Sequence, residues 1–181
     1  MHIYQFKNNI LSEQYPSLID ELKGCQVSRI LIIDDHQLFR AGLSLVLLQF
    51  HGEIEILEAT TVGQALVRFA AQPDPDLVLM DWHLPKENPL INLQRLKAKW
   101  PSACLVIVSA NEALPSQIPI AALGVTGFIP KTASPRMLVD ALSTVTQGGT
   151  YLPQGRMDTR ASNTPFGIDR LTPRQRQVLS A

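Results

Sequence analysis

Between about residues 29 and 150 the chain alternates short apolar runs with amphipathic segments. Five mostly apolar runs, each of four or five residues, are typical of buried strands and lie at 30–33, 54–57, 77–80, 104–108 and 125–129. The segments between them carry apolar residues three or four positions apart, the spacing of one helical face; the first set is Phe39, Leu43, Val46 and Phe50. Repeated strand-then-helix units predict a parallel sheet with helices on both faces.

The composition of the runs predicts their order in the sheet. The second run, within "IEILE", mixes glutamates with apolar residues, as an edge strand does. The first, third and fourth runs are almost wholly apolar, which favours central positions. We therefore expect an α/β fold of flavodoxin-like, doubly wound type, a five-stranded parallel sheet with strand order 2-1-3-4-5. Asn88-Pro89 and Ser134-Pro135 each pair an N-cap residue with proline at the first helical position, so each predicts a helix start.

Changes in character along the chain predict four parts. Residues 1–28 form an N-terminal extension, which we expect to be partly helical because Leu11, Tyr15, Leu18, Ile19 and Leu22 have helical spacing. This apolar stripe should pack either on the same chain or on a second copy, and a homodimer is slightly favoured. Residues 29–150 form the α/β domain, 151–170 are polar, without periodicity and typical of a linker, and 171–181 begin another helix.

Composition restricts the location and the partners. The 16 basic and 16 acidic residues balance, so no overall field favours nucleic acid or an acidic membrane surface. The two cysteines lack metal-type spacing, which is typical of a reducing compartment. No signal segment opens the chain and no apolar run is long enough for a membrane span. We expect a cytoplasmic protein with no membrane partner.

Polar residues follow four of the five predicted strands. The first run ends in Asp34 and Asp35, the third in Asp81, the fourth in Ser109, and the fifth, after a proline, in Lys131. Ligands of doubly wound sheets bind at the carboxyl ends of the strands, so these side chains should meet. Aspartate and serine are also common in turns, but turn composition alone is a poor explanation of the whole set. Carboxylates favour Mg²⁺, one carboxylate could attack phosphorus, and the hydroxyl and ammonium could hold phosphoryl oxygens.

Four segments resemble a response-regulator receiver domain: "LIIDDHQLFRAGL", "LVLMDWHLP", "LVIVSA" and "GFIPKTASPRMLVDAL". Ser109 and Lys131 stand 22 positions apart, as the corresponding pair of that family usually does. "DDHQLFRAGL", "GGTYL" and the closing "LTPRQRQVL" further resemble the NarL/FixJ-type subfamily, in which a LuxR-type helix-turn-helix follows the linker.

The resemblance implies a role for each site residue. Asp81 would be the phosphoacceptor, assisted by Ser109 and Lys131. Asp35 would bind Mg²⁺ directly, Asp34 mainly through water, and Asp81 and the main-chain carbonyl of His83 would complete the metal site. The switch residues would be Ser109 and Phe128. His36, beside the acidic pair, is less favoured as a ligand than as an ordinary helix-start residue.

By the same resemblance, the protein would be a response regulator of a two-component system. It would accept its phosphoryl group from a sensor histidine kinase, and beyond taking up and losing that group it would be no enzyme. DNA would be bound only through a C-terminal domain. Thr172, Pro173 and Gln175 mark the first helix of such a domain, but no recognition helix follows, so we expect the chain to be a truncated piece of a longer regulator.

Two other functions compete with this reading. A haloacid-dehalogenase-type phosphatase also uses an aspartyl phosphate, Mg²⁺, a hydroxyl and a lysine, but its nucleophile stands in a D-x-D motif after the first strand, where this chain has D-D. A receiver used only for interaction, without phosphorylation, would not need the intact acidic set.

Three prolines depart from the receiver pattern and bear on switching: Pro89 replaces a usual glycine, while Pro115 and Pro119 fall in the expected fourth helix, which should therefore be short or displaced.

Overall fold

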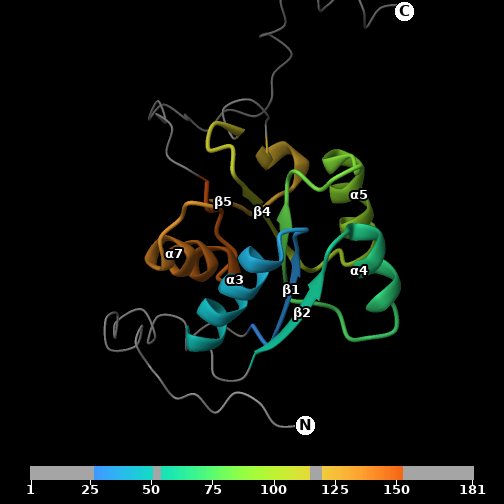
Figure 1. Cartoon of the computed structure of the whole chain (residues 1–181), viewed down its shortest axis with the longest axis horizontal. Helices are drawn as coiled ribbons and strands as arrows, with labels where there is room; N and C mark the ends of the chain where they lie inside the picture. Colours follow the sequence, from blue (N-terminus) through green and yellow to red (C-terminus); the bar gives the residue numbers. More distant parts are fainter. Residues whose placement is uncertain (1–26, 51–53, 115–119, 153–181) are drawn as a thin grey trace, which may run out of the picture.

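The computed structural model describes residues 27–50, 54–114 and 120–152. Within them a five-stranded parallel sheet has the order β2-β1-β3-β4-β5, as the apolar runs predicted (Figure 1). The strands are β1 (Arg29–Ile33), β2 (Glu55–Ala59), β3 (Leu77–Asp81), β4 (Cys104–Ser109) and β5 (Gly127–Pro130). The helices between and after them are α3 (Gln37–Phe50), α4 (Val62–Arg68), α5 (Pro89–Lys99), the 3₁₀ helix η1 (Ile120–Leu123) and α7 (Pro135–Thr146).

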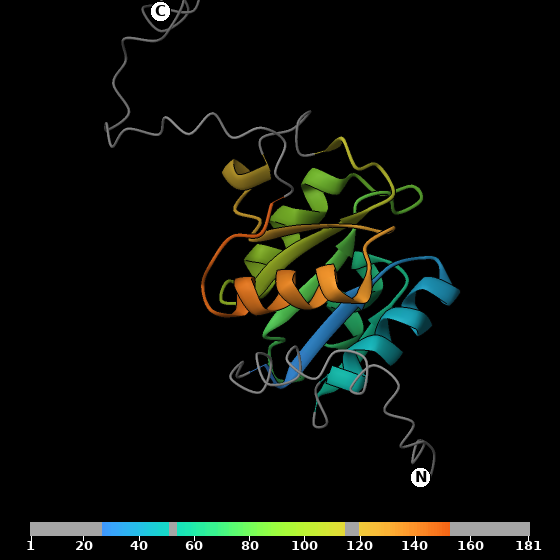
Figure 2. The ribbon, with the colours of Figure 1, turned by 90° about the vertical axis from the view of Figure 1, so that its left-hand side faces the viewer.

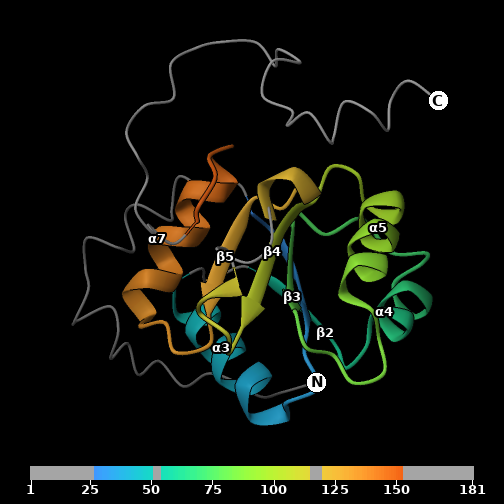
Figure 3. The same ribbon diagram turned by 90° about the horizontal axis from the view of Figure 1, so that it is seen from above.

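The helices form a layer on each side of the sheet, with α3 and α7 on one side and α4 and α5 on the other (Figure 3). Because successive strand residues point to opposite faces, each strand contributes to both layers. Ile30 and Ile32 pack toward α3 and α7, whereas Leu31 and Ile33 pack toward α4 and α5. Every residue of β3 is buried, as the wholly apolar third run predicted for a central strand.

Local signals in the sequence account for the helix starts. The side chain of Asn88 accepts hydrogen bonds from the backbone N–H groups of Leu90 and Ile91, and Pro89 takes the first position of α5. Ser134 caps α7 in the same manner. Pro89, which departs from the family pattern, therefore serves as a helix-initiating residue, because its missing N–H has no helical partner to lose at that position.

Three of the expectations concern segments at or beyond the limits of the described residues. Pro115 and Pro119, predicted to shorten the fourth helix, lie outside them, and the 3₁₀ helix η1 follows directly. The N-terminal extension and residues 153–181 also lie outside. Tyr151, which the sequence assigned to the linker, forms a bridge with Gly127. Its backbone accepts a hydrogen bond from Phe128 (2.8 Å), so the sheet edge continues past residue 150.

Candidate functional site

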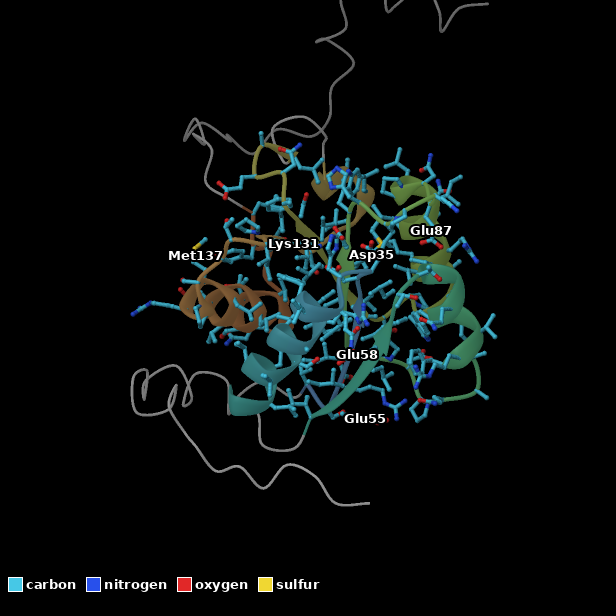
Figure 4. The ribbon with its side chains drawn as sticks, in the orientation of Figure 1. Asp35, Glu55, Glu58, Glu87, Lys131 and Met137 are labelled. Atoms are coloured by element: carbon cyan, nitrogen blue, oxygen red, sulfur yellow. The ribbon has the colours of Figure 1, made fainter. Side chains whose placement is uncertain are left out.

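The polar residues predicted at the strand ends come together at the carboxyl edge of the sheet. Asp34 and Asp35 follow β1, Asp81 ends β3, and Lys131 follows β5. Lys131 and Asp35 both lie at this edge (Figure 4), although β3 and β4 separate their strands in the sheet. Parallel pairing places the ends of β1, β3 and β4 side by side, with Asp81 opposite Val108. The parallel topology alone therefore gathers residues that are far apart in the sequence.

Two of the carboxylates are buried and share one ammonium group. The side chains of Asp34 and Asp81 are each only 2% exposed. The Nζ atom of Lys131 lies 2.7 Å from Oδ2 of Asp34 and 2.8 Å from Oδ2 of Asp81. Burial of Lys131 lowers its pKa, but the hydrogen bonds to Asp34 and Asp81 outweigh this, so its pKa lies above the ordinary value. Lys131 is therefore a fixed cation between two buried anions.

The cluster also has the composition of a site for a divalent cation. One ligand atom from each of Asp34, Asp35, His36 and Asp81 lies within 4.8 Å of the others. Three carboxylates and one ammonium group leave two negative charges uncompensated. Oxygen donors of this kind suit Mg²⁺, which also keeps several of its waters. The residues present thus fit the predicted Mg²⁺ by both donor chemistry and charge.

His36 contacts both members of the aspartate pair. Its Nδ1 atom lies 3.0 Å from Oδ1 of Asp34 and 3.0 Å from Oδ1 of Asp35. Its backbone N–H donates to Oδ1 of Asp34 (2.8 Å). The side chain is 64% exposed, so it lies at the mouth of the cluster. Its adjacency to the aspartate pair in the sequence accounts for these contacts, which do not decide whether His36 is a metal ligand.

A network missed at the sequence level holds the backbone of Asp34. Arg40, on α3, donates from Nη1 to the main-chain carbonyl of Asp34 (2.5 Å). The same guanidinium donates from Nε to Glu58 (3.3 Å), and the hydroxyl of Ser44 donates to the other oxygen of Glu58 (2.9 Å). On the other side, the Asp34 N–H donates to the carbonyl of Ala59 (3.1 Å). Arg40 and Glu58 thus position the first aspartate without contacting the cluster by their own charges.

The remaining predicted site residues lie around the cluster. Ser109 is buried at the end of β4; its Oγ accepts a hydrogen bond from the backbone N–H of Asn111 (3.0 Å), and its carbonyl accepts one from Lys131 (2.8 Å). The backbone N–H of His83 donates to Oδ1 of Asp81 (3.0 Å), while its side chain is exposed. Phe128, the predicted switch residue, is fully buried among core residues on the α4–α5 side.

Comparison with known proteins agrees with this geometry. The sequence profile of the response regulator receiver domain matches residues 30–143 of the chain. The chain belongs to this family. The chain is 32% identical over 152 residues to the transcriptional regulatory protein MctR of Rhizobium johnstonii, an alignment that covers 83% of this chain and 71% of MctR. It is 28% identical over 157 residues to the nitrate/nitrite response regulator protein NarL of Escherichia coli K12, covering 83% of this chain and 72% of NarL.

A solved structure supports the same assignment. The crystal structure of a LuxR family DNA-binding response regulator from Silicibacter pomeroyi superposes with a TM-score of 0.62 at 32% identity, covering 72% of this chain and 100% of that one. Two further curated relatives extend well beyond this chain, which spans 61% and 52% of their lengths. In the part of the chain that the structure describes, no helix is both long and apolar enough to cross a membrane.

Proposed function

We propose that Asp81 accepts a phosphoryl group from a partner histidine kinase in a Mg²⁺-dependent transfer. Through this transfer, a longer protein that contains this receiver domain would control transcription by a C-terminal DNA-binding domain. Beyond taking up and losing its own phosphoryl group, the domain would be no enzyme. The observation that carries the proposal is the contact of one ammonium, Lys131, with two buried carboxylates that come from different strands.

In the proposed transfer, a carboxylate oxygen of Asp81 forms a bond to phosphorus while the bond from phosphorus to the donor's imidazole nitrogen breaks. The electron pair of that bond leaves with the imidazole, and the product is an acyl phosphate on Asp81. Lys131, already 2.8 Å from an Asp81 oxygen, would hold an oxygen of the arriving group, and Ser109 lies on the neighbouring strand for another. Bound Mg²⁺ would offset the charge of the carboxylates and the phosphoryl oxygens.

We assign Asp34 and Asp35 to the metal and Asp81 to the phosphoryl group, as the family resemblance implies, and the contacts of Asp81 support this assignment. The Oδ1 atom of Asp81 accepts the His83 N–H and its Oδ2 atom contacts Lys131, so both oxygens are oriented. Asp34 is held in a similar way from its own backbone and from His36. The proposed ligands are therefore Asp34, Asp35, Asp81 and the main-chain carbonyl of His83, and Phe128 and Ser109 stay the proposed switch residues.

The test is intact-mass analysis after incubation with acetyl phosphate and Mg²⁺. The wild-type chain should gain one phosphoryl group that hydroxylamine removes, and Asp81→Asn should gain none. Asp74→Asn, an exposed aspartate outside the cluster, is the matched control and should behave like the wild type. An adduct that persists in Asp81→Asn but disappears in Asp34→Asn would indicate the phosphatase chemistry instead. No adduct on any variant would mean an interaction module that works without phosphorylation.

The output is tested separately. The sequence at residues 171–181 resembles the start of a LuxR-type helix-turn-helix, and a helix-turn-helix needs a recognition helix to read the major groove. We assign sequence-specific DNA binding to that C-terminal domain, and we expect the receiver domain to bind DNA no better than weakly and without sequence preference. A sequence-selective gel shift, competed by the same site but not by scrambled duplex, would contradict this assignment of the DNA-binding function.

A further inference from the structure

A hollow of about 300 Å³ opens between α3 and α7. The two helices lie side by side over this face of the sheet (Figure 2). Strand residues Val108 and Ile129 line the hollow together with Phe39 on α3 and Leu138 on α7. Lys131 is the one charged residue among those that line it. We call this hollow the α3–α7 groove. A groove of this size and apolar lining suits the anchor side chains of an amphipathic helix.

The exposed face of α3 continues the apolar surface beside the groove. In this helix the charged residue is Arg40, which points to Asp34 and Glu58 at the site. The exposed positions of α3 whose side chains the structure describes are Gln37, Leu38, Ala41, Gly42, Leu45 and Leu48. Leu38 is 89% exposed and Leu45 is 55% exposed. Single exposed leucines are ordinary, but a chargeless helix face beside an apolar groove is typical of a covered surface.

The chain enters the domain on the same side of the sheet as this groove. Val27 packs against the core cluster between the sheet and helices α3 and α7. The next residue, Ser28, is tied by its N–H to Asp76 (2.8 Å) at the opposite edge of the sheet from the acidic cluster. The described chain therefore begins on the α3–α7 side, which favours the groove of the same chain over any surface near α4 and α5 as the docking site of the preceding residues.

Residues 15–22 have the pattern that this groove requires. Tyr15, Leu18, Ile19 and Leu22 fall at positions i, i+3, i+4 and i+7, and Gly24 is suited to the residue after a helix end. A helix of these eight residues is ~12 Å long, and residues 23–26 span up to ~14 Å when extended. The distance from Val27 to the carboxyl edge of the sheet is six strand steps, or ~20 Å. The segment is long enough to reach the groove.

We propose that residues 15–22 dock as an amphipathic helix into the α3–α7 groove of their own chain. Sequence alone slightly favoured pairing with a second copy. The tether changes this balance, because a short linker raises the effective concentration of the segment at its own groove to the millimolar range. This docking does not depend on whether Asp81 is phosphorylated, so the two proposals stand or fall separately.

Gly42 offers a way to block the groove without disturbing the core. It lines the groove, and a Cβ atom added there would meet no heavy atom within 4 Å. Gly42→Arg should therefore fold and fill the groove with a charged side chain. Ala41→Arg is the matched control, since Ala41 is exposed on the same helix but does not line the groove.

The measurement is amide hydrogen exchange of the full chain, read by mass spectrometry over several protein concentrations. Peptides covering residues 15–22 should exchange about tenfold more slowly in the wild type and in Ala41→Arg than in an isolated peptide of residues 1–26. In Gly42→Arg the protection should be lost. Exchange in the wild type as fast as in the free peptide would overturn the proposal. Protection that appears only as concentration and dimer content rise would also overturn it, in favour of a second copy as the occupant.

Discussion

Replacing Asp35 with asparagine should stabilise the receiver domain without metal and remove its response to Mg²⁺. Asp35 adds a third carboxylate to a cluster whose donor atoms lie within 4.8 Å of one another. At 4.8 Å, two like unit charges repel by about 0.9 kcal/mol at the dielectric constant of water and by about 3.5 kcal/mol at an effective value near 20. Two other carboxylates, Asp34 and Asp81, repel Asp35, and the ammonium of Lys131 offsets about one of these two repulsions.

The exposure of Asp35 decides which end of this range applies. Its side chain is 31% exposed, so water and salt screen its charge far better than those of Asp34 and Asp81. We therefore expect Asp35→Asn to raise the free energy of unfolding in EDTA by about 1 kcal/mol. In the wild type, Mg²⁺ at a hundred times its Kd should add about 2.7 kcal/mol, and in the variant it should add little at the same concentration.

Urea unfolding, monitored by circular dichroism with EDTA and with Mg²⁺, measures both effects from one pair of curves for each protein. The midpoints should shift at an unchanged slope, which shows that the variant changes stability and not the compactness of either state. Asp74→Asn, outside the cluster, should shift neither curve. A lower midpoint for Asp35→Asn in EDTA, or equal stabilisation of both proteins by Mg²⁺, would refute the view that these carboxylates repel one another and share a cation.

Three other perturbations test the site and the core. Arg40→Gln should weaken Mg²⁺ binding about tenfold, measured by the fluorescence of Trp82 beside Asp81, because it removes the donor to the Asp34 backbone; an unchanged affinity would contradict the positioning role. Leu47→Ala should lower the free energy of unfolding by about 2–5 kcal/mol in urea titrations, since Leu47 is only 1% exposed. Burial raises the pKa of Cys104, so in a Cys25→Ser background its alkylation should be slower at pH 8 than that of a free thiol and should rise as the pH is raised further; equal rates would argue against burial of this thiol.

The fold could be predicted because its main signals are local. Apolar runs flanked by helical periodicity identify the strands and the parallel sheet, and the two glutamates in "IEILE" identify β2 as an edge strand. The starts of α5 and α7 could also be predicted, because an N-cap residue followed by proline acts on the backbone of its own helical turn. The continuation of the sheet edge at Tyr151 could not be predicted, because a single bridge to Gly127 produces no periodic pattern in the sequence.

The acidic cluster was predictable for a different reason. In a parallel sheet, position at a strand end is enough to bring Asp34, Asp81 and Lys131 together, so topology replaces any knowledge of side-chain packing. The residues that position the cluster from outside it could not be predicted from topology in this way. Arg40 reaches Glu58 across 18 residues of sequence, and both look like ordinary surface charges of a helix and an edge strand. Only the packing of α3 beside β2 shows that Arg40, while paired with Glu58, also donates to the main-chain carbonyl of Asp34.

The charged residues of the site and the residues that position them therefore contribute differently to the proposed mechanism. The charges that would do the chemistry sit at strand ends, where any doubly wound sheet could place them. The exactness of their geometry depends on longer-range contacts: the guanidinium of Arg40 on one carbonyl, and the N–H of Asp34 on Ala59. These two hydrogen bonds hold the two peptide units on either side of the Asp34 Cα atom, and they thereby restrict the positions that its side chain can take. The carboxylates of Asp34 and Asp35 determine which ions the site can bind, whereas Arg40, held by Glu58, determines how rigidly Asp34 is positioned.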